Sequence, residues 1–222
     1  MNKLNHVAFI MDGNGRWGQK KKKGRNFGHI NGVKTVKKTV EIAVKYKIPF
    51  ITFYVFSTEN WKRPKSEVNF LFKLITVYFK QELQNVISNG IRINILGKIS
   101  NLPGQIKSSL EKAINLTKNN KKITVNLAIN YGSKDEIVSA LKKLKKNISE
   151  KNIEKNLYTN KQPSPDILIR TGGHKRLSNF MLWQLAYAEL YFLDKLWPDF
   201  QSKDFVKIIN NYKNIKRNFG SI

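Results

Sequence analysis

At 222 residues the chain has the length of one α/β domain with a sizeable core, and it carries a net charge of +26. It contains no cysteine, which excludes disulfides and thiolate metal sites and fits a reducing cytoplasm. Strand signals begin near residue 6, which leaves no room for a signal peptide, and the longest apolar run, 48–56, is too short to span a membrane. We therefore expect a cytoplasmic protein whose membrane contact, if any, is peripheral.

The basic residues are spread along the whole chain and do not form one basic arm. Of the 41 Lys and Arg residues only seven are Arg. Five of these (16, 25, 63, 170 and 176) lie in the motif segments described below, and an Arg in a lysine-rich chain indicates a need for two-pronged contacts. The high charge leaves a nucleic-acid-binding protein as an alternative, which predicts salt-dependent binding to any duplex.

The predicted elements alternate between strand and helix, which is typical of a mostly parallel sheet covered by helices on both faces. The first strand is the apolar run 7–11. Further strands are expected over 50–56, 91–96, 123–129, 166–170 and 190–193. Helices are expected over 30–46, 66–89 with Ser66 as N-cap, 103–117, 134–146, 179–189 and 202–216, with a short helix inside the polar stretch 147–165.

The first strand runs directly into Asp12-Gly-Asn-Gly-Arg16, a segment that suits a bound diphosphate and Mg²⁺. Glycines let the backbone approach an anion, a single carboxylate beside phosphate oxygens is a common magnesium site, and Arg16 offers a planar fork to phosphate. Two alternatives compete. The segment 13–18 matches GxGxxG, although no acidic residue follows in 31–40 to bind a ribose. It could also be a simple polar turn.

Polar side chains also follow two other predicted strands. Ser57, Asn60 and Arg63 follow the strand 50–56, and Arg170, Arg176 and Ser178 follow the strand 166–170. Because the carboxyl ends of parallel strands share one edge of a sheet, we expect the three loops to converge on one cleft. Several guanidiniums with one or two carboxylates suit two polyanionic groups and a divalent cation. The sequence has no Walker-type loop, and its three histidines are too scattered for a zinc triad.

Six spaced motifs together resemble the cis-prenyltransferases, the family that includes undecaprenyl diphosphate synthase. They are His6 to Trp17, Gly28-His29, Phe56 to Arg63, Asn130-Tyr-Gly132, Ile169 to Phe180, and Trp183 to Pro198. The resemblance runs in order over nearly the whole chain. It implies a single-domain homodimeric enzyme that adds isopentenyl diphosphate repeatedly, in cis, to an allylic diphosphate, typically farnesyl diphosphate. The implied product is a long-chain polyprenyl diphosphate such as undecaprenyl diphosphate, the lipid carrier precursor for cell-wall synthesis.

The resemblance also implies roles for individual residues. Asp12 would lie at the Mg²⁺ and the allylic diphosphate, and Glu189 would complete the metal site from the partner side of a dimer. The allylic diphosphate would be cradled by Gly13, Asn14, Gly15, Arg16, Arg25 and His29. Isopentenyl diphosphate would be held by Arg170, Arg176, Leu177 and Ser178. The substrates would be lined by Trp17, Ser57, Thr58, Glu59, Trp61 and Arg63.

Asn60 takes the place of the proton acceptor in this family. A neutral amide is a poor base, so we favour a positioning role or a relay to a diphosphate oxygen. The broad apolar face of the helix 66–89, with the strand 50–56, would wall a hydrophobic tunnel for the growing tail. The alternative is that these aromatic residues only pack in the core.

Three positions depart from the family pattern. Val55 stands where a smaller Ala is usual and would narrow the tunnel, so a short-chain product is the alternative within the family. His174 stands where Glu is usual, near the isopentenyl diphosphate site, and Asn218 stands where Arg is often found. An inactive accessory subunit is disfavoured by the retained Asp12 and arginines. The run Lys20–Lys23 is expected to be a solvated loop or a contact to an anionic membrane surface.

Overall fold

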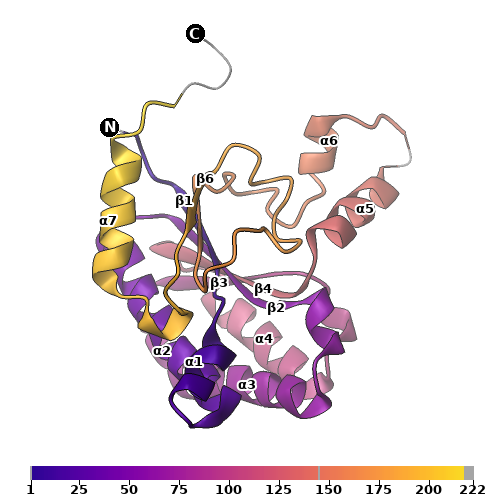
Figure 1. Cartoon of the computed structure of the whole chain (residues 1–222). Coiled ribbons are helices and arrows are strands. Elements are labelled where there is room, and N and C mark those ends of the chain that lie inside the picture. Colours follow the sequence, from indigo (N-terminus) through magenta and orange to yellow (C-terminus); the bar gives the residue numbers. More distant parts are fainter. Residues whose placement is uncertain (1, 145, 218–222) are drawn as a thin grey trace.

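The computed structural model describes residues 2–144 and 146–217. Its centre is a six-stranded sheet in the order β3-β4-β2-β1-β5-β6, in which all five neighbouring pairs are parallel (Figure 1). The strands are β1 (His6–Ile10), β2 (Phe50–Ser57), β3 (Ile91–Leu96), β4 (Ile123–Tyr131), β5 (Ile167–Arg170) and β6 (Glu189–Phe192). The predicted α/β fold with a parallel sheet of about six strands is thus confirmed.

Helices connect the strands from β1 to β5, and α7 follows β6. They are α1 (Asn14–Lys20), α2 (Gly24–Lys45), α3 (Lys65–Ser88), α4 (Gly104–Thr117), α5 (Ser133–Lys143), α6 (Glu150–Glu154) and α7 (Ser202–Lys213). Three short 3-10 helices are η1 (Thr58–Lys62), η2 (Ile99–Asn101) and η3 (Trp197–Asp199). The short helix predicted within 147–165 is α6.

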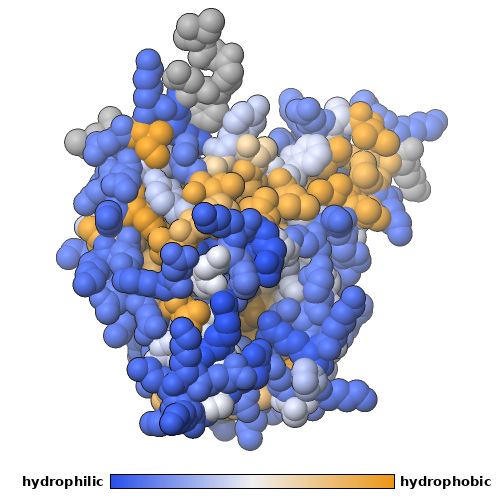
Figure 2. Space-filling view, viewed as in Figure 1, coloured by the Kyte–Doolittle hydropathy of each residue, from blue (hydrophilic) through white to orange (hydrophobic). Residues whose placement is uncertain are grey.

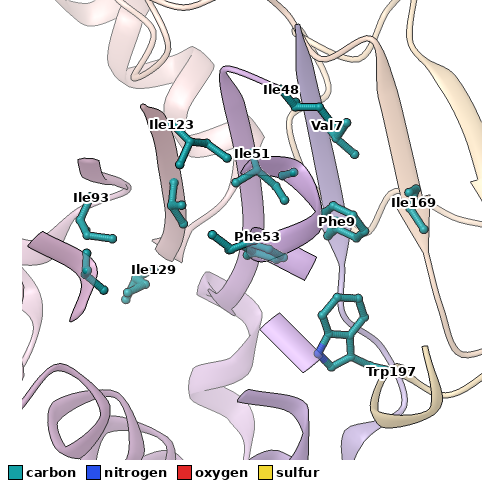
Figure 3. Close-up of a cluster of buried hydrophobic side chains, with 14 of the residues drawn as sticks. Val7, Phe9, Ile48, Ile51, Phe53, Ile93, Ile123, Ile129, Ile169 and Trp197 are labelled. Carbon is teal, nitrogen blue, oxygen red and sulfur yellow. The ribbon is translucent and has the colours of Figure 1, made fainter. Parts of the chain in front are cut away.

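The larger core lies between one face of the sheet and the helices α2, α3, α4 and α7 (Figures 1 and 3). All five residues of β1 and all four of β5 are buried, which explains why these strands read as continuous apolar runs. The aromatic side chains Phe9, Phe53 and Trp197 meet at the centre of this face. This packing fixes the strands whose carboxyl ends carry the polar loops.

The opposite face of the sheet is covered differently from what the sequence predicted. A helix was expected over 179–189, but residues 178–187 form turns and Glu189 belongs to β6. Ser178, Asn179 and Met181 have positive φ angles of 51°, 61° and 46°, which no helix accommodates. Phe180 and Met181 are nevertheless fully buried against this face, so the aromatic pattern reflected burial and not helical periodicity.

Several predicted boundaries are also corrected. The helix expected over 30–46 begins six residues earlier, because α2 starts at Gly24. The predicted cap Ser66 lies inside α3, whose N-cap is Pro64. The helix expected over 134–146 ends at Lys143, and the last helix ends at Lys213 and not at 216. β3 forms one end of the sheet and β6 the other.

Candidate functional site

The three polar loops meet at one cavity of about 700 Å³ at the carboxyl edge of the sheet. They follow β2, β1 and β5, which are neighbours in the sheet order. The predicted site residues that line this cavity are Asp12, Gly13, Asn14, Gly15, Arg16, Arg25, His29, Ser57, Glu59, Asn60, Arg63, Arg170, Arg176 and Ser178. The expected convergence of the three segments is therefore present in the fold.

Asp12 is the carboxylate at the centre of the cleft, and it pairs with two arginines. Its Oδ1 accepts a hydrogen bond from Nη2 of Arg16 at 3.2 Å, and its Oδ2 accepts one from Nη2 of Arg170 at 3.0 Å. Arg16 also donates to the carbonyl oxygen of Gly172 at 2.8 Å, which joins the first loop to the third. The Asp12 side chain keeps 28% of its surface exposed, so it remains accessible to a ligand.

Arg170 is the most buried cation of the cleft, with 4% of its side chain exposed. Its Nη1 donates to Oγ of Ser178 at 2.8 Å and to the carbonyl oxygen of Arg176. Its Nε is buried and has no hydrogen-bond partner among the described residues. Arg170 therefore links the third loop to Asp12 through hydrogen bonds and forms a buried part of the cavity wall.

The first loop is packed against α2 through glycines. A Cβ at Gly28 would lie 1.8 Å from the carbonyl oxygen of Asn14, and one at Gly18 would lie 2.1 Å from the carbonyl oxygen of Gly24. No side chain fits at such distances, so α1 and α2 touch backbone to backbone. This glycine seam (Gly18, Gly28) holds the Asp12–Arg16 turn in a fixed place beside Arg25 and His29, which lie on α2.

Glu67, in the first turn of α3, is the centre of a second charged cluster. Its partners Arg25, His29 and Arg63 line the cleft, and Glu67 stands behind them. It accepts hydrogen bonds from Nε and Nη2 of Arg25 at 3.0 and 3.1 Å and from Nη1 of Arg63 at 3.2 Å. Nε2 of His29 lies 3.3 Å from Oε1. Burial would raise the pKa of Glu67, but the hydrogen bond and charge of Arg25 outweigh it, so the pKa falls below its ordinary value. Burial lowers the pKa of His29.

Asn60 closes the turn that follows β2. Its Oδ1 accepts a hydrogen bond from the backbone N–H of Ser57 at 3.2 Å, as part of a capping box at the start of η1. Its neighbour Trp61 donates from Nε1 to Oδ1 of Asn130 at 2.8 Å and packs on Phe56. The amide oxygen of Asn60 is thus already engaged as an acceptor.

Five predicted site residues do not line the cavity: Trp17, Thr58, Trp61, Leu177 and Glu189. The Trp17 ring stacks on Phe27 and donates to Asp199, away from the cleft. Glu189 pairs in register with Ile167, the first residue of β5, whereas Arg170 is the last. It therefore lies toward the amino edge of the sheet and is separated from Asp12 within the same chain.

The sequence analysis missed two residues that organise the cleft, Glu67 and Asn179. Asn179 donates from Nδ2 to Glu59 at 2.8 Å and accepts from the backbone N–H of Lys134 at 2.9 Å, which joins the second and third loops. Glu67 carried a signal, since it stands four residues after Arg63 at the start of a helix and an i,i+4 pair is expected there. Nothing in the sequence signalled the role of Asn179.

A second cavity, of about 250 Å³, opens between α2, α3 and the β3–β4 side of the sheet. Its lining is mainly apolar and includes Val36, Val40, Val44, Tyr78, Phe79, Val86, Ile91, Ile93, Val125 and Leu127. The lining of the polar cavity also includes apolar side chains, among them Val55 and Leu71. Leu71 and Phe79 are two turns apart on α3, about 12 Å at ~1.5 Å per residue. The two cavities thus lie along one helix.

A magnesium ion could be held in the cleft only with the help of a ligand. Among residues 2–144 and 146–217, no three His, Cys, Asp or Glu side chains come together as a metal site. Asp12 is the accessible carboxylate of the Asp12–Arg16–Arg170 group. This donor set fits Mg²⁺, which commonly uses one or two carboxylates and completes its shell with phosphate oxygens and water.

The surface shows an apolar band that is distinct from the cleft. Figure 2 shows hydrophobic residues gathered across the upper part of the view, over the region of β6 and toward α5 and α6, whereas hydrophilic residues cover most of the lower part. On the edge strand β6, Leu190 is 45% exposed, and Tyr187 just before it is 69% exposed. No helix in the described part of the chain is long and apolar enough to cross a membrane.

Comparison with known proteins gives a consistent result. Residues 10–220 match the family model described as "Putative undecaprenyl diphosphate synthase". The chain is 47% identical to an isoprenyl transferase of Fusobacterium nucleatum over 221 residues, covering 98% of this chain and 96% of the relative. It is 45% identical to an isoprenyl transferase of Rickettsia felis, covering 99% of this chain and 95% of the relative.

Two solved structures resemble the fold over its whole length. One is lavandulyl diphosphate synthase from Lavandula x intermedia in complex with dimethylallyl diphosphate, with a TM-score of 0.94, 33% identity and 98% of each chain covered. The other is a probable undecaprenyl diphosphate synthase from Campylobacter jejuni, with a TM-score of 0.86, 36% identity and 100% of each chain covered.

Proposed function

Because the chain belongs to the undecaprenyl diphosphate synthase family of isoprenyl transferases, we propose that it is a magnesium-dependent cis-prenyl diphosphate synthase. In this proposal it adds isopentenyl diphosphate repeatedly to farnesyl or another allylic diphosphate. The product is a long-chain polyprenyl diphosphate such as undecaprenyl diphosphate, the precursor of a cell-wall lipid carrier. The observation that carries the proposal is the single cavity lined by Asp12, five arginines and apolar side chains such as Val55 and Leu71.

The allylic diphosphate binds between the first loop and α2. Gly13 to Arg16 approach it with backbone and guanidinium groups, while Arg25 and His29 face it from α2. The solved relative bound to dimethylallyl diphosphate supports a substrate of this class. Because the glycine seam holds the first loop in place, little ordering is required when the anion arrives, and preorganised donors are the efficient way to stabilise a leaving group.

Isopentenyl diphosphate binds at the third loop, to Arg170, Arg176 and Ser178. Support comes from the pairing of Arg170 with both Asp12 and Ser178, which brings the two diphosphate sites next to each other. Condensation breaks the allylic carbon–oxygen bond, with the electron pair going to the diphosphate oxygen. It then joins the allylic carbon to the terminal alkene carbon and releases one proton. Arg16 and Arg170 stabilise the charge on the two diphosphates.

Mg²⁺ would be held by Asp12 together with diphosphate oxygens, and Glu189 would contribute from the partner side of a dimer. When bound, the ion would help neutralise the charge of the departing diphosphate. Asn60 acts as a positioning group and not as the base. Its Oδ1 already accepts the Ser57 N–H, and an amide is only very weakly basic, so the proton passes to a diphosphate oxygen.

The growing tail extends from the polar cavity along α3 into the apolar one. Leu71 and Phe79 both lie on the broad apolar side of α3, which residues at i, i+4 and i+8 share. Each isoprene unit has five carbons, and its burial is worth roughly 4 kcal/mol at ~0.8 kcal/mol per CH₂. That gain draws the tail away from the charged cleft. Val55 lines the route at its start and narrows it.

The enzyme is a homodimer that pairs through the β6 side of the sheet. Support comes from the exposed side chains of Tyr187 and Leu190, which lie beside and on this edge strand. Figure 2 shows an apolar band over the same region of the fold. Glu189 is on the same strand, so a dimer of this kind would bring it to the partner. Size-exclusion chromatography with light scattering measures the oligomeric state.

We place the enzyme in the cytoplasm, with contact to an anionic membrane surface through the exposed residues Lys20 to Lys23. Lys20 is the last residue of α1 and the other three lysines follow it, all of them exposed. Each can contribute up to ~1 kcal/mol near such a surface. Co-sedimentation with anionic liposomes that weakens at high salt is the expected result. Salt-independent association would contradict an electrostatic contact.

The decisive test is incubation of the purified chain with farnesyl diphosphate, isopentenyl diphosphate and Mg²⁺, with the products separated by chain length. We expect a long-chain product that disappears when the metal is chelated. A short-chain product would identify the short-chain alternative and point to Val55. The absence of any elongation with farnesyl, geranyl and dimethylallyl diphosphates would contradict the proposed function.

A further inference from the structure

The carboxylate of Glu67 is bound entirely by side chains of the cleft. Oε1 faces donors of Arg25, Arg63 and His29 at 3.1, 3.2 and 3.3 Å, and Oε2 accepts from Nε of Arg25 at 3.0 Å. Only 10% of the Glu67 side chain is exposed. No backbone N–H among the described residues donates to this carboxylate. The carboxylate therefore holds the side chains of Arg25, Arg63 and His29 and makes no hydrogen bond to the described backbone of the fold.

We propose that Glu67 is a positioning residue for the diphosphate site, whose negative charge fixes Arg25, Arg63 and His29 in the orientation that binds the substrate anion. This inference rests on the proposed function, because it takes those three side chains as diphosphate ligands. Glu67 itself does not touch the substrate.

The placement of Arg25 shows what the carboxylate does. The Arg25 guanidinium uses Nε and Nη2 to bind both oxygens of Glu67, a two-pronged contact that sets the plane of the group. On its other side it lies directly over Gly15, because a Cβ on Gly15 would come within 2.6 Å of its Cζ and Nη1. The guanidinium is thus clamped between Glu67 and the turn that carries Asp12, with Nη1 on the Gly15 side.

The placement of Arg63 adds a second reason. Arg25 and Arg63 both approach Oε1, so their positive charges are close together. The charge of Arg25 lowers the pKa of Arg63, while that of Glu67 raises it, although burial has the largest effect. Without the carboxylate the two guanidiniums would repel each other and separate. Glu67 therefore makes their common orientation possible before any substrate arrives.

His29 is fixed in one tautomer by the same carboxylate. A carboxylate at its ordinary charge only accepts hydrogen bonds, so Nε2 of His29 carries the proton and Nδ1 of the neutral ring is left as an acceptor. His6 has the opposite arrangement: Nδ1 lies 2.7 Å from the carbonyl oxygen of Pro163 and must carry the proton, while Nε2 accepts from Thr52 at 2.6 Å. The two rings can be told apart by spectroscopy.

The proposal predicts the sign of a mutation. If Glu67 merely occupied the anion site or repelled the substrate, removing its charge would strengthen diphosphate binding. If it positions the cations, removing its charge weakens binding. In Glu67→Gln we expect the Kd for inorganic diphosphate, measured by titration calorimetry, to rise about ten-fold, the size of one lost charge-assisted hydrogen bond. Glu67→Asp keeps the charge on a shorter arm and should recover part of the affinity.

A matched control is available on the same helix. Glu82 also joins α3 to α2, through an ion pair with Lys37 at 3.0 Å, but both residues line the apolar cavity and not the polar one. Inorganic diphosphate has no tail to reach that cavity. Glu82→Gln removes one charge and one bridge between these helices, so its Kd for inorganic diphosphate should equal that of the unmodified chain. An equal loss in both variants would assign the effect to helix packing and overturn the proposal.

A second measurement does not depend on binding. Nitrogen-15 NMR of the histidine rings should show His29 as the Nε2–H tautomer, changing to a mixture in Glu67→Gln, while the His6 signals stay unchanged as a check on the fold. Unchanged His29 signals, or a lower Kd in Glu67→Gln, would overturn the proposal. Neither readout needs turnover, so a chain that binds diphosphate but makes no polyprenyl product would contradict the proposed reaction and leave the role of Glu67 intact.

Discussion

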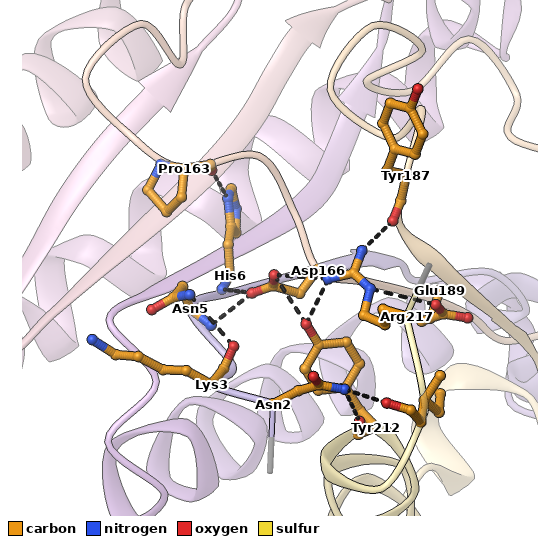
Figure 4. Close-up of polar contacts among 11 residues, drawn as sticks. Asn2, Lys3, Asn5, His6, Pro163, Asp166, Tyr187, Glu189, Tyr212 and Arg217 are labelled. Atoms are coloured by element: carbon orange, nitrogen blue, oxygen red, sulfur yellow. Dashed lines mark hydrogen bonds and ion pairs between the residues drawn. The ribbon is translucent and has the colours of Figure 1, made fainter. Parts of the chain in front are cut away.

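The carboxyl edge and the amino edge of the sheet, where the strands end and begin, both carry carboxylates, but the carboxylates bind different kinds of donor. At the carboxyl edge, Asp12 and Glu67 are held by arginine and histidine side chains that border a cavity of about 700 Å³. At the amino edge, Asp166 accepts hydrogen bonds from the backbone N–H groups of Asn5 and His6 at 2.6 and 3.0 Å, and from Tyr212 at 3.1 Å (Figure 4). Only the first arrangement leaves room for a ligand.

The difference shows how to tell a binding carboxylate from a structural one. Asp166 joins β1, β5 and α7, with Arg217 3.7 Å away, and it lines neither of the two cavities described above. Backbone donors cannot turn toward a substrate, so such a carboxylate can only hold the fold together. Side-chain donors such as Arg16 keep further N–H groups for an anion. The two kinds of carboxylate differ in their exposure, in whether side chains or backbone groups donate to them, and in whether a cavity lies beside them. They do not differ in residue type.

The largest expected effect is at the carboxyl edge. Asp12→Asn removes the charge that pairs with Arg16 and Arg170 and the carboxylate proposed to hold Mg²⁺. We expect the rate of isopentenyl diphosphate incorporation to fall about 1,000-fold, the size typical of losing a key electrostatic group. Thermal unfolding of the variant serves as the control for folding. A rate within a few-fold of the unmodified chain would show that the two edges do not differ in the proposed way.

The pH dependence of stability tests the amino edge. Burial lowers the pKa of His6 from 6.5 to about 4, against the smaller opposing effects of Pro163 and Asp166. Since the unfolded state takes up the proton first, this group costs stability as the pH falls from 6.5 toward 4, by up to about 3 kcal/mol at 1.36 kcal/mol per pKa unit. Urea unfolding at pH 7 and pH 4.5 measures the loss. His6→Asn should remove this part of the pH dependence, and an identical pH profile would contradict the assignment.

A smaller effect is expected when the amino edge loses its carboxylate. Asp166→Asn keeps the shape of the side chain but presents an NH₂ group to donors that need an acceptor. The free energy of unfolding should fall by about 2 kcal/mol, the usual cost of unsatisfied buried groups, while kcat changes little. Denaturant titration and steady-state kinetics separate the two quantities. A large loss of kcat with normal stability would place Asp166 among the functional residues instead.

Asn60, also at the carboxyl edge, can be tested for a positioning role against a role as proton acceptor. If the amide only positions groups, as its bond to Ser57 suggests, Asn60→Ala and Asn60→Asp should both lower kcat, and neither should shift its pH dependence. A true proton acceptor predicts that Asn60→Asp stays active, with a pH–rate profile displaced by the ionisation of the new carboxyl group. The pH dependence of kcat for both variants distinguishes the two roles.

The smallest expected effect is on the product and not on the rate. Val55 lines the polar cavity, and Val55→Ala removes two methyl groups from the route proposed for the tail. We expect the chain-length distribution to shift upward by about one isoprene unit, since one small cavity is opened. Product analysis on reverse-phase plates measures the shift. An unchanged distribution would mean that Val55 does not limit the tail.

The sequence alone predicted the strand ends and the loops that follow them, because long buried runs such as 50–56 end abruptly in polar residues. Parallel pairing then required the loops to share an edge. The sequence did not predict the start of α2, since the lysine run at 20–23 hid the point where the helix begins. It missed the turns at 178–187 because positive φ angles at Ser178 and Asn179 depend on tertiary contacts.

The residue pattern alone predicted the candidate site where its chemistry follows strand ends, whereas Arg25 and His29 on α2 were predicted through the family resemblance. Asp12, Arg63 and Arg170 were identified from their position after a strand. Glu67 showed only its i,i+4 spacing from Arg63 in the sequence, because its partners on α2 come from 38 and 42 residues away. Sequence spacing cannot show which face of α2 packs against which face of α3. That information enters only when α2 and α3 are packed on the sheet.

The glycine seam limits how this protein can change over generations. A lysine-rich exterior tolerates the exchange of one hydrophilic residue for another, so most of the surface is free to drift with genome composition. Gly18 and Gly28 have no such latitude, because even one methyl group at Gly28 would have to occupy the space of the Asn14 carbonyl oxygen. Any relative that keeps this anion-binding turn therefore has to keep glycine at both positions.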